Sequence, residues 1–115
     1  MTGHHADAVE SGVKAFCECV RSRTNRSEDG DPLMTVAFSP NAPLLRINRG
    51  RSQTDESEQR GHMLLCQGVV AAWRNPRAHE LVDDSPARAL MMLELLNDLM
   101  TTTKAAVRTR KRRAA

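Results

Sequence analysis

An arginine and a histidine stand five positions apart in residues 74–79, which read Arg-Asn-Pro-Arg-Ala-His. The guanidinium of Arg74 can bind phosphate oxygens in a bidentate manner. His79 can accept and donate protons near neutral pH, because the unperturbed histidine pKa is about 6.5. Phosphate binding, charge stabilisation and proton transfer are what phosphodiester cleavage needs when no metal takes part. The segment is therefore our candidate catalytic site, and we expect neither a metal nor another cofactor.

The local sequence also predicts how these side chains are held. Proline disfavours helical geometry in the residue before it, so Asn75 should leave the preceding helix. Asparagine is a good N-cap and Pro76 suits a first helical position, which predicts a new helical turn that contains His79. The free N–H groups at such a helix start bind phosphate readily. We assign catalytic roles to Arg74, Asn75 and His79, and a substrate-binding role to Arg77.

A purely structural interpretation competes with this one. The spacing of arginine and histidine alone is weak evidence in a chain with many arginines, and the Asn-Pro cap carries more weight. In the alternative, Arg74 and His79 form ion pairs with acids that are close in the sequence, such as Glu80, Asp83 or Asp84. A solvent-exposed role for Arg77 is as plausible as contact with a second phosphate.

Apolar residues recur at helical spacing around this segment, which predicts an all-α bundle of four to five helices with no sheet. We expect helices over residues 6–23, over a short stretch from Leu33 to Phe38 that Pro40 ends, over residues 57–73, and from Ser85-Pro86 onward. Ser85 and Pro86 have the residue types of an N-cap and a first turn. The last helix should fray near residues 101–103.

Val9, Val13, Phe16 and Val20 form the predicted apolar face of the first helix, and Leu65 and Leu90 widen the apolar faces of the central and last helices. Other positions in these helices carry more specific expectations. Ser52, Thr54 and Asp55 are alternative N-caps for the central helix. Gly61 and Gly68 are seven residues apart and therefore lie on one side of it, which suggests close approach of another helix; tolerated surface glycine is the alternative.

Charge is distributed unevenly along the 115 residues, a length that suits a single domain. The net charge is +3, but six basic residues and no acid lie between Lys104 and Arg113, and without them the charge becomes −3. We therefore divide the chain into a helical domain, residues 1–103, and a basic, disordered tail, residues 104–115. Such a tail can anchor RNA through its phosphates, or it can simply aid solubility.

The three cysteines have no metal-ligand spacing, and we expect Cys17, Cys19 and Cys66 to be reduced. The N-terminus lacks the apolar run of a secretory signal. Apolar stretches such as residues 89–93 are far too short to span a bilayer. We expect a cytoplasmic protein without a membrane partner.

The chain resembles the Ymh-type family of conserved hypothetical prokaryotic proteins, a branch of the HEPN superfamily. The resemblance extends over about residues 8–103. The string Arg-Asn-Pro-Arg-Ala-His-Glu at residues 74–80 is its most specific part. The supporting matches are Leu33-Met34 with Ala37-Phe38-Ser39, Asp55-Glu56 with Gln59 and Gly61, Gly68, and Ala89.

The resemblance implies a HEPN-like helical bundle whose R-x4-H motif is Arg74 and His79, with Asn75 as the polar residue after the arginine. It implies a homodimer in which the two motifs face each other, and RNA as the substrate. Cleavage in such proteins is metal-independent and proceeds by attack of the RNA 2′-OH. The implied setting is a toxin–antitoxin, abortive-infection or other defence system with a regulatory partner such as an antitoxin. A non-catalytic HEPN-like dimer that binds nucleic acid or a partner protein is the alternative.

Overall fold

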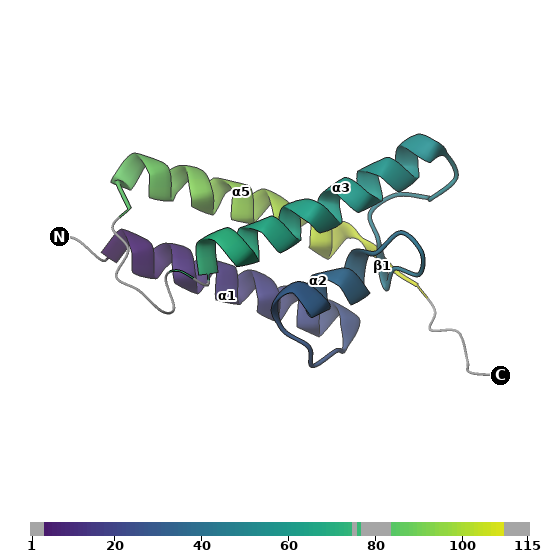
Figure 1. Cartoon of the computed structure of the whole chain (residues 1–115), viewed down its shortest axis with the longest axis horizontal. Coiled ribbons are helices and arrows are strands. Elements are labelled where there is room, and N and C mark those ends of the chain that lie inside the picture. Colours follow the sequence, from purple (N-terminus) through teal and green to yellow (C-terminus); the bar gives the residue numbers. More distant parts are fainter. Residues whose placement is uncertain (1–3, 75, 77–83, 110–115) are drawn as a thin grey trace.

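The computed structural model describes residues 4–74, 76 and 84–109, and its elements form an elongated helical bundle (Figure 1). The long helices confirm the predicted all-α class. The elements, in chain order, are α1 (His4–Thr24), α2 (Gly30–Phe38), β1 (Leu45–Arg46), α3 (Gln53–Val69), the π-helical turn η1 (Val70–Arg74), α5 (Pro86–Ala105) and β2 (Val107–Arg108).

The helices α1 and α5 lie side by side and run in the same direction, while α3 runs the opposite way across them (Figure 1). Two contacts fix the parallel register: Gly12 faces Leu93 and Leu96, and the Arg23 side chain donates a hydrogen bond to the carbonyl of Ala106. A Cβ on Gly12 would lie 3.0 Å from Leu93, so this glycine permits the close approach of the two helices.

The core is built mainly from the predicted helical stripes. The predicted face of α1 is completely buried, and Cys66, Val69 and Val70 from the central helix and Ala89, Met92, Leu96 and Leu99 from α5 pack in the same cluster. Two predicted core positions are wrong: Leu65 is 53% exposed and Leu90 is 58% exposed. Each lies at the edge of a predicted apolar stripe, on a part of its helix surface that stays exposed in the single chain.

Helix α3 begins four residues earlier than predicted, because Ser52 is the N-cap that the chain uses. Its hydroxyl oxygen accepts a hydrogen bond from the backbone N–H of Asp55 at 3.0 Å. Helix α5 begins as predicted, with Ser85 as its N-cap and Pro86 in its first turn.

The end of α5 and the strand after it differ from the prediction in two ways. The helix does not end near residues 101–103, because the buried Thr103 hydroxyl donates to the carbonyl of Leu99 and the helix continues to Ala105. Beyond it, β2 pairs antiparallel with β1, with Leu45 opposite Arg108, although no sheet was predicted. Helix α5 and β2 thus continue past residue 103 as far as Arg108, and residues 110–115 of the predicted tail lie outside the described part.

Candidate functional site

Of the four predicted site residues, only Arg74 belongs to the described part of the chain. Asn75, Arg77 and His79 lie outside it, so the predicted turn and the Arg74–His79 geometry stay predictions. Arg74 is the last residue of η1, and its side chain is 24% exposed. The site is therefore built here from Arg74 and the residues that hold it.

The π-helical turn η1 widens the end of the central helix just before Pro76. A proline ring clashes with the carbonyl four residues earlier, here that of Ala72, and proline has no N–H to donate to it. Wider i→i+5 pairing is one way in which a helix accommodates such a conflict, and π-turns are frequent at functional sites. Pro76 itself has helical geometry. The turn thus sets the direction in which Arg74 leaves the helix.

The Arg74 guanidinium forms an ion pair with Asp29, with 2.8 Å between Nη1 and Oδ2. Asp29 lies 45 residues earlier in the sequence. The alternative interpretation had named acids close to residue 79, and it did not include this partner. One N–H of the guanidinium is used in the contact, and a guanidinium carries five. Asp29 consequently holds Arg74 in place through one of these five N–H groups.

The loop between α1 and α2 brings Asp29 to this position. Asn25 ends α1 in the left-handed conformation, with a φ of 56°, which asparagine tolerates better than most residues. Gly30 begins α2 with a φ of 57°, close to Val70 of η1. Between them, Asp29 caps α2 by accepting a hydrogen bond from the N–H of Gly30 at 2.9 Å.

A second arginine, Arg21 of α1, contacts the same carboxylate. Its Nη1 lies 2.9 Å from Oδ1 of Asp29, and its Nη2 lies 2.6 Å from Glu18. The hydrogen bond from Arg74, followed by the other contacts, lowers the pKa of Asp29 below its usual value despite partial desolvation. Asp29 therefore stays ionised at neutral pH and joins α1, α2 and η1 through charge-assisted hydrogen bonds.

The Glu18–Arg21–Asp29–Arg74 chain can position a cation and stabilise developing negative charge. It consists of carboxylates and guanidinium groups and contains no histidine, so we look for the proton-transfer residue elsewhere in the chain. His62 is not that residue: it is buried on α3, packs edge-on against Phe38 and lies 3.5 Å from the Cys66 sulfur. Burial lowers the pKa of His62, so its ring is neutral at pH 7.

Metal and membrane features can be stated for the described residues alone. Within residues 4–74, 76 and 84–109, no group of three or more His, Cys, Asp or Glu side chains could hold a metal ion. None of the described helices is both long and apolar enough to cross a bilayer. All three cysteines are free thiols.

An apolar groove of about 500 Å³ adjoins Arg74 on the outer face of the central helix. Gly61 and Gly68 both lie in it, and a Cβ at either would meet nothing within 4 Å, so none of the helices that the structure describes approaches them. Leu64 is 51% exposed and Leu65 is 53% exposed beside them. The groove is lined by Gly61, Leu64, Leu65, Gly68, Val69, Ala72 and Trp73, the last of which precedes Arg74.

These features define a small helical-bundle protein with a positioned arginine at a π-helical helix end and an open apolar helix face beside it. The chain belongs to the Hypoth_Ymh family, described as a protein of unknown function, whose model matches residues 1–102. The match confirms the resemblance to the Ymh-type family. No curated protein matches the chain, and no solved structure does.

Proposed function

We propose that this protein is a metal-independent endoribonuclease of the HEPN superfamily, cytoplasmic and active in a prokaryotic toxin–antitoxin, abortive-infection or other defence system. The single observation that carries the proposal is the position of Arg74. It stands at the end of η1, directly before the Asn-Pro-Arg-Ala-His sequence, and Asp29 holds its guanidinium through one N–H group.

The proposed reaction uses the 2′-OH of RNA as the nucleophile. A histidine removes its proton, the oxygen attacks the adjacent phosphorus, and the 5′-oxygen leaves with a proton supplied by a second histidine. The products are a 2′,3′-cyclic phosphate and a 5′-hydroxyl. Arg74 stabilises the charge on the non-bridging oxygens, Asn75 caps the turn that presents His79, and Arg77 contacts a neighbouring phosphate.

The two histidines are those of two chains in a homodimer. A two-fold axis near the end of α3 supplies an acceptor and a donor from one motif. The apolar groove beside Arg74 supports this placement, since Gly68 and Ala72 allow a second copy of the helix to approach closely. We expect Leu65→Glu to convert the dimer to a monomer in light scattering. Leu90→Glu, an equally exposed leucine on α5, should leave the dimer intact.

Cleavage is tested with purified dimer and total RNA in EDTA, followed by mapping of the ends. We expect cyclic-phosphate ends, no cleavage of DNA, which lacks the 2′-OH, and loss of cleavage in His79→Ala. Lys14→Ala removes an exposed cation of α1 and should cleave like the parent. Persistent cleavage by His79→Ala would mean that another residue moves the proton.

The exposed apolar groove also favours a second candidate function, a non-catalytic dimer that binds nucleic acid or a partner protein. This candidate predicts the dimer and its loss in Leu65→Glu, but no RNA cleavage. Wild-type protein that cleaves no RNA, even after removal of a co-purifying regulator such as an antitoxin, would favour it.

A further inference from the structure

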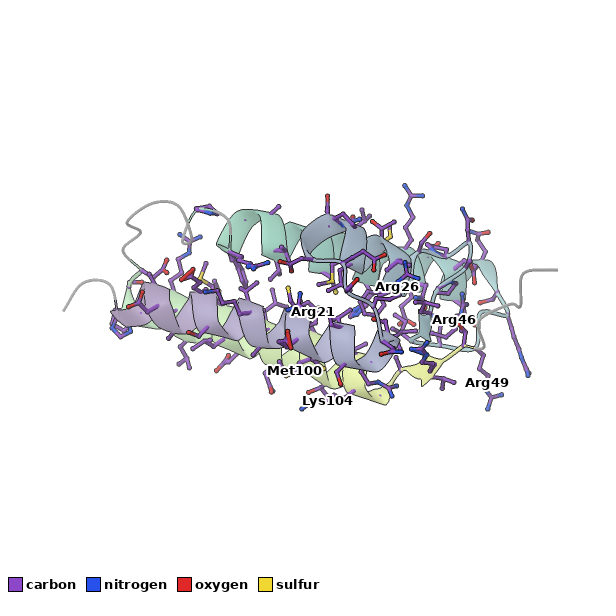
Figure 2. The ribbon with its side chains drawn as sticks, turned by 90° about the horizontal axis from the view of Figure 1, so that it is seen from below. Arg21, Arg26, Arg46, Arg49, Met100 and Lys104 are labelled. Atoms are coloured by element: carbon purple, nitrogen blue, oxygen red, sulfur yellow. The ribbon has the colours of Figure 1, made fainter. Side chains whose placement is uncertain are left out.

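Three arginines line a groove at the end of the bundle opposite Arg74, where β1, β2 and the start of α3 meet. The groove has a volume of about 440 Å³, and its walls are Arg46, Ile47, Asn48, Arg49, Arg51, Ala105 and Val107. Arg49 and Arg51 are exposed, and Figure 2 shows Arg49 projecting away from the body of the protein. At a rise of about 1.5 Å per helical residue, α3 and η1 separate this groove from Arg74 by about 30 Å.

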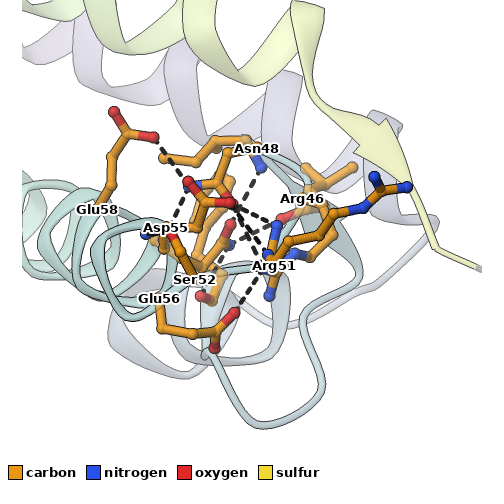
Figure 3. Close-up of polar contacts among 12 residues, drawn as sticks. Arg46, Asn48, Arg51, Ser52, Asp55, Glu56 and Glu58 are labelled. Atoms are coloured by element: carbon orange, nitrogen blue, oxygen red, sulfur yellow. Dashed lines mark hydrogen bonds and ion pairs between the residues drawn. The ribbon is translucent and has the colours of Figure 1, made fainter.

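The loop that carries these arginines has a fixed backbone (Figure 3). Asn48 donates to the carbonyl of Asp55 and to the Glu58 carboxylate, both at 2.8 Å, and accepts from the N–H of Gly50 at 3.0 Å. Gly50 has a φ of 64°, and a Cβ there would overlap the Arg46 guanidinium. The arginines therefore extend from an ordered turn.

The carboxylates near the groove pair with one arginine side chain, that of Arg46. Glu56 pairs with Arg46 at 2.6 Å, and Asp55 accepts from the backbone N–H of Arg51 at 3.0 Å. No carboxylate in the described part of the chain forms an ion pair with the side chain of Arg49 or Arg51. Exposed arginines without acidic partners are suited to bind phosphate, because their N–H donors and charge remain available.

Lys104 and Arg108 are two further exposed basic residues at this end. Thr109 is tied to the loop before β1: its N–H donates to the carbonyl of Leu44 at 2.9 Å, and its hydroxyl to that of Pro43 at 2.7 Å. The end of β2, which carries Arg108, is thus anchored beside the groove, and Lys104 lies in the last turn of α5.

We infer that this arginine groove binds the phosphate backbone of single-stranded RNA, as a second contact about 30 Å from Arg74. The choice of RNA among polyanions rests on the proposed function. Arginine favours it as well, because the planar fork matches phosphate oxygens. The groove holds the strand without reading its sequence, since phosphate contacts carry no base information.

The test measures binding without cleavage, in a full-length His79→Ala parent. Fluorescence anisotropy of a labelled single-stranded RNA of about 20 nucleotides is followed in increasing KCl. Each phosphate contact to a single strand contributes about 0.7 to the slope of log K against log salt. Arg49→Ala/Arg51→Ala should therefore lower that slope by about 1.4 and weaken binding roughly 10-fold at low salt.

Lys14→Ala/Arg88→Ala is the matched control, because it removes two exposed cations far from the groove. It should change binding less than 2-fold, since only long-range attraction is lost. An unchanged slope in the groove variant, or an equal loss in the control, overturns the inference. So does parent protein that binds phosphatidylserine vesicles but not RNA. If RNA binds through the groove and wild-type protein does not cleave it, the proposed function fails while the groove stands.

Discussion

The arginines at the two ends of the α3–η1 helix differ in whether a carboxylate holds them. At the C-terminal end, Asp29 contacts Arg74 on one oxygen and Arg21 on the other, so the guanidinium of Arg74 is held by a carboxylate from another part of the chain. At the N-terminal end, Arg46 pairs with Glu56, while the side chains of Arg49 and Arg51 are exposed and form no ion pair with another described residue.

The difference distinguishes an arginine that is held in a defined position from arginines whose charge is available to bind a ligand. A paired arginine has lost side-chain freedom in advance and can meet a reacting group in a defined geometry. An unpaired arginine keeps its full charge and adapts to a flexible polyanion, which suits binding more than chemistry. The comparison predicts that substitutions at the two ends affect different measurements.

The largest expected effect is that substitutions at one end lower the cleavage rate, whereas substitutions at the other end weaken RNA binding. Loss of one donor that stabilises a developing oxyanion costs about 10²- to 10³-fold in rate. We therefore expect Arg74→Ala to lower kcat by that factor with little change in RNA affinity, and Arg49→Ala/Arg51→Ala to raise KM with little change in kcat. Steady-state cleavage of a short RNA separates the two. Equal losses in kcat for both variants would remove the distinction between the ends.

The next effect concerns the fold that sets the groove. Gln59, which is completely buried, donates to the carbonyls of Phe38 at 3.0 Å and Leu45 at 2.9 Å, and accepts from the N–H of Ile47 at 3.0 Å. Gln59→Leu leaves these backbone groups unpaired, and each buried unpaired group costs about 1–3 kcal/mol before relaxation. We expect a loss of roughly 3 kcal/mol in the free energy of unfolding, measured by urea denaturation.

Gln67 offers the matched control on the same helix, since among the described residues its side chain bonds to the exposed Thr35 hydroxyl alone. Gln67→Leu should cost less than about 0.5 kcal/mol, as surface substitutions usually do. Comparable losses for the two glutamines would show that the Gln59 contacts are not what joins α2, β1 and α3.

The sequence predicted the parts of this structure that local residues determine. Ser85-Pro86 start α5 as expected, and the stripe from Val9 to Val20 is buried, because capping and helical periodicity act within a few residues. The pairing of β1 with β2 joins residues more than 60 positions apart, and two-residue strands have no periodicity to detect.

The candidate site was predictable to a smaller extent. The residue types and the Asn-Pro pair drew attention to Arg74, but its partner Asp29 was missed, since it meets Arg74 only after α1 and α2 pack against η1. Asp29 precedes Gly30 in a segment that the sequence indicates only as a polar loop, with no sign of an ion pair. The arginine groove was missed for the same reason, because β2 completes it from the other end of the chain.

The smallest expected effect compares the two carboxylates that pair with arginine. Asp29→Asn keeps the shape of the side chain but removes the charge that holds Arg74, and a partly exposed ion pair is worth about 0.2–1 kcal/mol. We expect a loss of stability in that range at pH 7, together with a lower kcat, because Arg74 is no longer fixed. Since the folded-state pKa of Asp29 is lowered, its contribution is present above the unfolded pKa and is lost as pH falls through the lowered value. The parent and Asp29→Asn should therefore converge in thermal melts below about pH 4, where the unfolded carboxyl is protonated.

Glu56→Gln makes the matched change at the other end, and it frees Arg46 for phosphate, so it should leave kcat unchanged and tighten RNA binding. Weaker RNA binding in Glu56→Gln would mean that the Arg46–Glu56 pair builds the groove, and that pairing does not distinguish the two ends.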